Sequence, residues 1–356
     1  MMNIILTGGG TAGHVTPNLA LIPFLQNEGF CVHYIGMKNS IEESLICACP
    51  NVTFHSVRSG KFRRYFSWKN FSDPFRVLAG ILDARHIIQT VQPAAIFSKG
   101  GFVTVPVAFA AKQLRIPFLL HESDYTPGLA NRIAIRSASK VLVTFEDTLP
   151  HTRSKGICTG TPIRSELFAG HAQRGKQYLQ FFDEKPILLC MGGSQGAVAI
   201  NHALREALPL LLPRFNIVHL CGASNLDSAC SHEGYRQFEY MQDELPDIMA
   251  AADVVVSRAG ANSIFEFLAV GLPALLIPLP KSSSRGDQIL NAHYFSRKGY
   301  ASILEQENLT SESLAQAVQS LYANRHQYIT TMAQSPQKNG TKNTLDILFE
   351  SIAINQ

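Results

Sequence analysis

The feature that most constrains this chain is a repeated pattern in which short apolar segments alternate with segments of helical periodicity. Near-continuous runs of Val, Ile and Leu are typical of strands in parallel sheets, because helices cover both faces of such sheets. Nine segments predict strands: Asn3–Leu6, Cys31–Ile35, Ala94–Phe97, Phe118–Leu120, Lys140–Thr144, Ile187–Met191, Ile217–Leu220, Val254–Ser257 and Ala274–Ile277. The pattern therefore predicts an α/β protein.

The chain is long enough for two domains. Its 356 residues are more than a domain with one hydrophobic core usually contains. A new strand, glycine loop and helix start appear at Pro186–Gly196, so we expect the second domain to begin near Thr159–Leu167, with the polar, basic Gly170–Gln177 as a connection. The predicted fold is two doubly wound, Rossmann-like parallel-sheet domains facing one cleft.

Composition excludes several classes of protein. No apolar run approaches the roughly 20 residues of a spanning helix, and the first residues resemble a strand more than a signal peptide. We therefore expect the bulk of the protein in the cytoplasm. The seven cysteines are scattered without a CxxC pair, which indicates neither a disulfide framework nor a zinc site. The net charge of +4 does not indicate nucleic-acid binding.

Three glycine-rich loops follow predicted strands. Gly8–His14 matches GxGxxG, but the acidic residue that a dinucleotide site needs after its second strand is absent, which disfavours NAD. Ser98–Thr104 is either a ligand loop or a simple strand-to-helix turn. Gly192–Gly196 combines small residues with a hydroxyl at a helix start, which suits a diphosphate.

The third loop has a second interpretation. Gly192–Gly196 also spells GxSxG, the nucleophile elbow of α/β-hydrolases, with Asp253 or Asp287 and then His293 completing the order. A single-sheet hydrolase does not explain the complete series of strands and helices before residue 160. Hydrolase chemistry at Ser194 is therefore an alternative.

The segment Ser257–Glu266 has the composition of a nucleotide-binding helix start. Glu266 is suited to accept hydrogen bonds from both hydroxyls of a ribose, or else complements the dipole at a first helical turn. Further along, Asp287 and Gln288 either bind sugar hydroxyls or cap the next helix.

Several motifs in order resemble the MurG family of UDP-N-acetylglucosamine transferases. They are GGTAGHVTP at Gly9–Pro17, LLHESDYTPGLANR at Leu119–Arg132, GTPIR at Gly160–Arg164, GGSQG at Gly192–Gly196, SRAGANSIFEFLAVGLP at Ser257–Pro273, and SRGDQILNA. The resemblance implies the GT-B fold, with the acceptor in residues 1–162, the UDP-sugar in residues 163–338, and a C-terminal helix in 339–356 that returns to the first domain.

The resemblance also implies roles for individual residues. Donor contacts fall on Arg164, Ser194, Gln195, Met241, Ala261, Asn262, Ser263, Glu266 and Gln288, with Met241 at the uracil and Glu266 at the ribose. Thr11, Ala12 and Gly13 match the loop that closes over the donor sugar. Two positions depart from the family: Ala12 replaces a usual glycine, and Asp124, a predicted substrate contact, replaces a usual asparagine.

The resemblance implies inversion at the anomeric carbon by direct displacement of UDP. His14, at a helix start where its ring is expected to stay neutral, is our predicted general base. His121 and Glu122 compete as base or substrate clamp. No DxD pair or His/Cys cluster occurs, so we predict a metal-independent enzyme without a cofactor.

The expected partners are UDP-N-acetylglucosamine, a polyprenyl-diphosphate acceptor and an anionic membrane, with cell-wall synthesis proteins as further candidates. Cations and aromatic residues interleave in Ser59–Lys69, which suits a peripheral position on the cytoplasmic face of the membrane; the alternative is a solvated loop. The predicted activity is the conversion of lipid I to lipid II. Alternatives are transfer to another lipid such as diacylglycerol, or a UDP-sugar epimerase.

Overall fold

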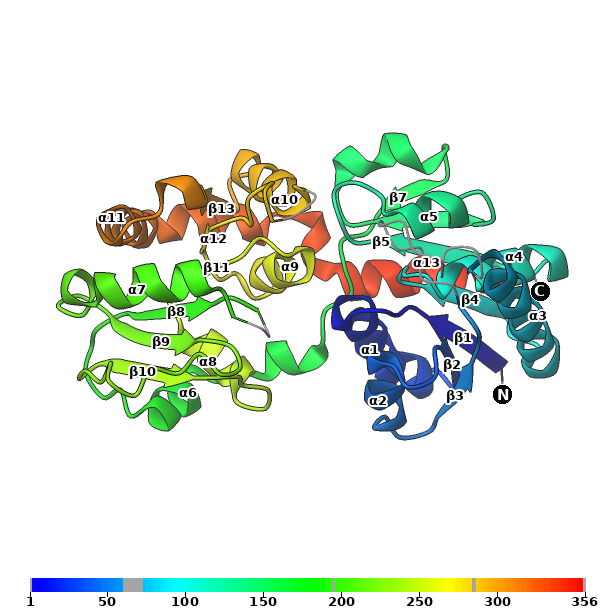
Figure 1. Cartoon of the computed structure of the whole chain (residues 1–356), viewed down its shortest axis with the longest axis horizontal. Coiled ribbons are helices and arrows are strands. Elements are labelled where there is room, and N and C mark those ends of the chain that lie inside the picture. Colours follow the sequence, from blue (N-terminus) through cyan, green and yellow to red (C-terminus); the bar gives the residue numbers. More distant parts are fainter. Residues whose placement is uncertain (1, 60–72, 194–195, 284–285, 355–356) are drawn as a thin grey trace. The chain divides into compact units, whose positions relative to one another are not determined.

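The computed structural model describes residues 2–59, 73–193, 196–283 and 286–354, and the chain forms two compact units (Figure 1). Unit 1 contains Met1–Arg164 and Asn339–Gln356, and unit 2 contains Ser165–Lys338. Each unit has its own sheet and its own buried core.

Unit 1 is built on a parallel sheet whose described strands run in the order β3-β2-β1-β4-β5-β6-β7. They are β1 (Met2–Thr7), β2 (Phe30–Gly36), β3 (Val52–Ser56), β4 (Ala95–Ser98), β5 (Phe118–Glu122), β6 (Lys140–Val143) and β7 (Gly156–Cys158). The strand order reverses between β1 and β4. In open α/β sheets, ligands bind beyond the carboxyl ends of the strands at such a switch point.

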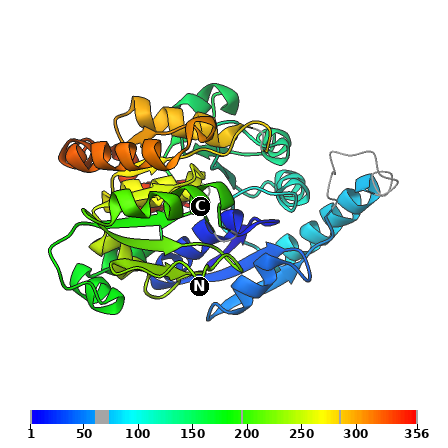
Figure 2. The ribbon, with the colours of Figure 1, turned by 60° about the vertical axis from the view of Figure 1, so that its left-hand side comes forward.

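Helices cover both faces of this sheet. They are α1 (Ala12–Asn27), α2 (Ile41–Cys47), α3 (Asp73–Val91), α4 (Thr104–Leu114) and α5 (Leu129–Ala134), with the short helix η2 (Glu146–Thr152) before β7. Residues of α3, α4 and α5 share one core with the sheet, and residues of α1 and α2 share another. Figure 2 shows α3 along its length in light blue.

The last helix of the chain also belongs to unit 1. After η5 (Pro336–Asn339), α13 (Gly340–Ala353) buries Leu345, Leu348 and Ile352 in the core shared with α1, and is drawn in red in Figure 1. Complete burial of each such side chain stabilises the fold by about 2 kcal/mol. The apolar spacing of α13 thus holds the chain's end against the first sheet.

Unit 2 contains a second parallel sheet, with its described strands in the order β10-β9-β8-β11-β12-β13. They are β8 (Ile187–Met191), β9 (Asn216–Leu220), β10 (Tyr235–Phe238), β11 (Val254–Ser257), β12 (Ala274–Leu276) and β13 (Ala301–Ile303). The order reverses between β8 and β11, so this sheet has a switch point of its own.

Helices of unit 2 follow most of these strands. They are η3 (Ser165–Ala169), α6 (Ala172–Leu179), α7 (Val198–Leu211), α8 (Leu245–Ala251), α9 (Ala261–Val270), α10 (Asp287–Arg297), η4 (Gln306–Asn308), α11 (Ser311–Ala323) and α12 (Arg325–Ala333). Helices α7 and α11 share a buried core with the sheet. The arrangement is again that of a Rossmann-like domain.

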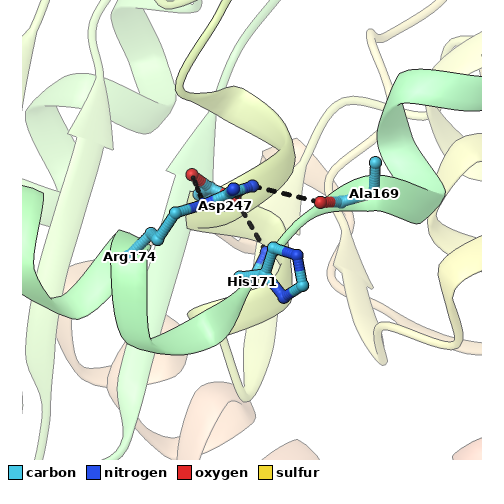
Figure 3. A network of polar contacts seen from close by, with 4 residues as sticks. All are labelled: Ala169, His171, Arg174 and Asp247. Atoms are coloured by element: carbon cyan, nitrogen blue, oxygen red, sulfur yellow. Dashed lines mark hydrogen bonds and ion pairs between the residues drawn. The ribbon is translucent and has the colours of Figure 1, made fainter.

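The segment that we predicted as a connection at Gly170–Gln177 is instead largely helix α6, packed against α8. Figure 3 shows the polar contacts of this segment: two of the three guanidinium nitrogens of Arg174, Nε and Nη2, donate to the Asp247 carboxylate, at 2.9 and 2.8 Å. Asp247 also accepts from the main-chain N–H of His171 at 2.7 Å, and Arg174 donates to the Ala169 carbonyl. These polar residues hold the start of unit 2 in place.

All nine predicted strands are present, and the described residues contain four more: β3, β7, β10 and β13. These four strands form the two edges of each sheet. No helix in the described part of the chain is long and apolar enough to cross a membrane.

Candidate active site

The first glycine loop connects β1 to α1 at the switch point of unit 1. A fully buried carboxylate, Glu42, holds it: Oε2 accepts from the Gly10 N–H and Oε1 from the Met37 N–H, both at 3.2 Å. Thr11 is exposed as the N-cap of α1, and Ala12 and Gly13 are the first two helical residues. The Gly10 amide is thus directed to a protein carboxylate.

His14 lies in the first turn of α1 and turns back over this loop. Its Nδ1 is 3.0 Å from the Gly9 carbonyl oxygen and 3.4 Å from Thr11 Oγ1, and the ring is half-buried. A carbonyl oxygen only accepts, so we assign the proton to Nδ1. In a neutral ring this leaves the lone pair on Nε2, as a general base requires.

The second glycine loop packs directly against the first. Gly9 donates its N–H to the Gly100 carbonyl at 3.3 Å. Gly101 has φ of +87°, and a Cβ there would lie 2.1 Å from the Gly9 carbonyl oxygen. Ser98–Thr104 was interpreted either as a ligand loop or as a simple turn between a strand and a helix. In the structure, its glycines allow close packing against the first loop.

The carboxyl end of β5 brings His121, Glu122 and Asp124 next to these loops. Glu122 Oε1 accepts from the Asp124 N–H at 2.9 Å; Oε2 accepts from the Gly128 N–H at 3.1 Å and from Asn131 Nδ2 at 2.8 Å. Glu122 is 5% exposed, whereas Asp124 is half-buried. Glu122 therefore shapes the loop that carries Asp124.

His121 is fully buried and is bound through both ring nitrogens. Nε2 is 2.8 Å from the Gly160 carbonyl oxygen, and Nδ1 is 2.9 Å from Nζ of Lys99. Lys99 is also fully buried, and its Nζ donates to Thr161 Oγ1 at 3.1 Å. This geometry leaves His121 no ring nitrogen for a substrate.

Burial sets the ionisation of this cluster. It lowers the pKa of Lys99 to about 7, against the attraction of Glu122 and Asp124, and raises the pKa of Glu122 to about 7. Asp124 adds to the rise for Glu122, while the accepted hydrogen bonds oppose it. Burial and the neighbouring Lys99 lower the pKa of His121 well below its ordinary value, so His121 is neutral.

In unit 2, the loop after β8 occupies the corresponding place at the switch point. Ser194 and Gln195 lie outside the described residues. Gly196 has φ of +76°, and a Cβ there would lie 2.0 Å from the Cys221 carbonyl oxygen, so this loop packs closely on the end of β9. Helix α7 begins at Val198, directly after the loop.

Geometry argues against Asp253 as the carboxylate of the hydrolase alternative. Asp253 lies just before β11, and its carboxylate accepts from the N–H of Ile187 at the start of β8. In a parallel sheet, the first residues of all strands lie on one side and the last residues of all strands lie on the opposite side. Asp253 is therefore remote from the GxSxG loop, which follows the end of β8.

Helix α9 carries the predicted ribose site. It begins at Ala261, so Glu266 lies in its second turn, half-buried, and the alternative that it complements the dipole at a first turn is wrong. Asn262 and Ser263 are half-buried at the helix start. Before the helix, Arg258 Nη1 donates to the carbonyls of Ile277 and Pro278, which fixes the loop after β12.

The remaining predicted donor contacts come from three separate segments. Gln288 Oε1 accepts from the Leu279 N–H at 3.0 Å, which holds the loop before α10. Met241 follows β10 and is 3% exposed. Arg164 is half-buried and is the last residue of unit 1. The roles of these residues stay predictions.

Sequence reasoning missed three polar residues that organise unit 1: Glu42, Lys99 and Asn131. The sequence did contain a signal for Lys99, because a basic residue directly after an apolar strand and before two glycines is unusual. Glu42 had none beyond its place in a helix start. Among the described residues, no group of three or more His, Cys, Asp or Glu side chains is placed to hold a metal ion.

Comparison with known proteins covers both units. Residues 4–143 match the glycosyltransferase family 28 N-terminal domain and residues 187–346 match the corresponding C-terminal domain. The chain is 51% identical over 347 residues to the UDP-N-acetylglucosamine–N-acetylmuramyl-(pentapeptide) pyrophosphoryl-undecaprenol N-acetylglucosamine transferase of Clostridium tetani, covering 97% of each chain. It is 50% identical to a Bacillus cereus enzyme of the same name, numbered 2, over 99% of this chain and all of that one.

A solved structure gives the same result. The crystal structure of Acinetobacter baumannii MurG matches with a TM-score of 0.79 at 26% identity, over 98% of this chain and 100% of that one. The expected GT-B fold class, with two Rossmann-like parallel-sheet domains, is confirmed.

Proposed function

Because this chain belongs to the MurG family of UDP-N-acetylglucosamine–N-acetylmuramyl-(pentapeptide) pyrophosphoryl-undecaprenol N-acetylglucosamine transferases, we propose that it converts lipid I to lipid II. The donor is UDP-N-acetylglucosamine, and the acceptor is N-acetylmuramoyl-pentapeptide on undecaprenyl diphosphate. Similarity to enzymes of this name over nearly the full length of both chains carries the proposal.

The proposed reaction is a single displacement. The acceptor hydroxyl oxygen attacks the anomeric carbon of the donor sugar as the bond from that carbon to the UDP oxygen breaks. UDP leaves with the electron pair, and the acceptor proton passes to the base. Attack from the face opposite to UDP inverts the anomeric configuration.

His14 is the proposed base. Its Nδ1 faces the Gly9 carbonyl oxygen, so in the neutral ring the hydrogen is on Nδ1 and the basic nitrogen is Nε2. His121 is less suited because both of its nitrogens are bound inside unit 1. Glu122 is less suited because three donors already occupy its carboxylate.

We assign donor binding to unit 2. The loop after β8 and the start of α7 are the proposed diphosphate site. There the main-chain N–H groups at the helix start stabilise the negative charge that develops on UDP. Glu266 is the proposed acceptor for the ribose hydroxyls, with Arg164, Met241, Ala261, Asn262, Ser263 and Gln288 as further proposed contacts. The reaction is proposed to need no metal.

The predicted membrane segment Ser59–Lys69 lies, except for Ser59, outside the described residues. We also propose that unit 1 docks peripherally on the cytoplasmic face of the membrane, through a groove beside α4 and α5. The groove has a volume of about 850 Å³, and its lining includes the cations Lys112, Arg132, Arg136 and Arg153 and no acidic side chain among the described residues. Phe109 and Leu129, 40% and 56% exposed, lie among these cations. Apolar side chains ringed by cations suit an anionic lipid surface.

The double substitution Arg132→Glu with Arg136→Glu is expected to weaken binding to anionic vesicles by about 30-fold or more, since each cation near such a surface contributes about 1 kcal/mol. Co-sedimentation with vesicles containing phosphatidylglycerol measures this. Lys185→Glu with Arg214→Glu, two exposed cations of unit 2, matches the change in net charge. Equal loss in both double variants would contradict a specific membrane face.

The test of function is UDP release from UDP-N-acetylglucosamine in EDTA, with and without a short-chain lipid I analogue, together with the mass of the product. Release that depends on the analogue and adds one N-acetylhexosamine to it supports the proposal. UDP-sugar conversion without any acceptor would point to an epimerase. Tight binding of the UDP-sugar without release of UDP would overturn the assigned acceptor but would still support the proposed donor site.

A further inference from the structure

Lys99 is a buried lysine to which the proposed reaction assigns no role. It follows β4 at the switch point of unit 1, near the start of the second glycine loop, and its side chain is 0% exposed. Placing an ammonium group in a protein interior is costly unless hydrogen-bond acceptors surround it. Its partners therefore indicate what it holds in place.

These partners come from three separate segments. The main-chain N–H of Lys99 donates to the Thr7 carbonyl at the end of β1, at 3.0 Å. Its Nζ lies 2.9 Å from Nδ1 of His121 at the end of β5, and 3.1 Å from Oγ1 of Thr161 in the segment that leads to unit 2. One residue thus connects β1, β5 and this segment.

The two partners of His121 determine the direction of its hydrogen bonds. Nε2 of His121 faces the Gly160 carbonyl oxygen, which only accepts, so Nε2 carries the hydrogen. In the neutral ring Nδ1 is then the acceptor and Lys99 is the donor. The result is a continuous chain of hydrogen bonds from Lys99 through His121 to Gly160.

The segment Thr159–Arg164 is also held from its other side, by α13. Thr341 Oγ1 bonds with both the N–H and the carbonyl of Ile163, each at 2.8 Å, and Asn343 Nδ2 donates to the Thr159 carbonyl at 3.0 Å. This segment is the last part of unit 1 before the chain enters unit 2. It lies fixed between α13 and the pair formed by Lys99 and His121.

The residue after His121 extends the same network to the acceptor side. Glu122 holds the loop through Gly128 by its hydrogen bonds to Asp124, Gly128 and Asn131. Glu122 and Asp124 are also the carboxylates whose charge attracts the Lys99 ammonium. The cation therefore lies between the loop of the predicted acceptor contacts and the segment Thr159–Arg164.

We propose that Lys99 is a positioning residue for the acceptor half of the active site, holding the ends of β4 and β5 and the segment Thr159–Arg164 in one arrangement through His121 and Thr161. This inference rests on the proposed function for its kinetic consequence, but not for its geometry.

The geometry is tested by nitrogen-15 NMR of the wild-type protein labelled at histidine, with His121→Gln to assign the signal. We expect His121 as the neutral tautomer with hydrogen on Nε2, and with Nδ1 shifted by an accepted hydrogen bond. Lys99→Met should remove that shift at Nδ1 without moving the hydrogen from Nε2. A cationic ring, or hydrogen on Nδ1 in the wild type, would overturn the inference without bearing on the proposed function.

The kinetic test compares Lys99→Met with Lys140→Met. Lys140 also forms a polar contact within unit 1, with Glu350, but it lies at the start of β6, whereas Lys99 follows the end of β4. We expect Lys99→Met to lower kcat/KM for the lipid acceptor by about tenfold or more, with the KM for UDP-N-acetylglucosamine changed by less than about twofold. Lys140→Met should change neither value.

Thr161→Val provides a second variant if Lys99→Met does not fold, since it removes one hydrogen bond of Lys99 at nearly constant side-chain volume. It should weaken acceptor use in the same direction, by a smaller factor. Acceptor kinetics like those of Lys140→Met, or an equal loss for donor and acceptor, would overturn a positioning role. Absence of turnover in the wild type itself would instead count against the proposed function.

Discussion

Replacing His14 by alanine is expected to lower kcat by about 10²- to 10⁴-fold, the range that positioned acid–base groups contribute. The reason is geometric: the Gly9 carbonyl orients the ring so that Nε2 presents its lone pair. Binding of UDP-N-acetylglucosamine should stay close to wild type, because the predicted donor contacts lie mostly in unit 2. Single-turnover UDP release and calorimetric UDP binding separate the two effects.

Two controls sharpen this result. His14→Gln keeps a side chain that donates to Gly9 but takes up no proton, so it should be as slow as His14→Ala, and added imidazole should partly restore His14→Ala. His86→Ala, at an exposed position on α3 of the same unit, should leave kcat unchanged. If His14→Ala keeps more than about a tenth of wild-type kcat, the base lies elsewhere, and Glu122→Gln is the next variant to examine.

Replacing Glu266 by alanine is the second change expected to have a large effect. Hydrogen bonds to a charged group contribute about 1.5–3 kcal/mol each, so the loss of two ribose contacts should lower affinity for UDP by about 100-fold or more. The loss should appear in kcat/KM for the donor, with acceptor KM little changed. Calorimetry with UDP measures it directly.

A deoxynucleotide makes the test specific. Wild type should bind 2′-deoxyuridine diphosphate more weakly than UDP, whereas Glu266→Ala should bind the two alike, because the group that distinguishes them is gone. Glu206→Ala, on the exposed face of α7, is the matched control. Unchanged discrimination in Glu266→Ala would show that this carboxylate does not contact the 2′-hydroxyl.

The strands that sequence reasoning missed share one position. β3, β7, β10 and β13 are the outermost strands of their sheets. Interior strands such as β5 are buried at every residue, which gives a continuous apolar run, whereas β3 has no fully buried residue and β7 is half-buried throughout. An edge strand pairs on one side only, so its composition is not distinctive.

The predicted site residues divide in a similar way. His14, Glu122 and Glu266 were identified from motifs, and the structure places them in the first turn of α1, at the end of β5 and in the second turn of α9. Lys99, Glu42 and Asn131 were not identified as organising residues, because their importance comes from hydrogen-bond partners in other segments of the chain. The partner of Lys99 at Thr161, for example, is 62 residues away.

The sequence by itself determined the class of fold, the two-domain organisation and the family, because apolar periodicity and ordered motifs are local patterns that a chain displays before it folds. Only the tertiary structure decided which ring nitrogen of His14 and of His121 carries the hydrogen, which carboxylate holds which loop, and that a buried lysine joins three segments. These properties depend on distances of about 3 Å between residues far apart in the chain. Hydrogen-bond chemistry acts at that range, and packing of the folded chain sets it.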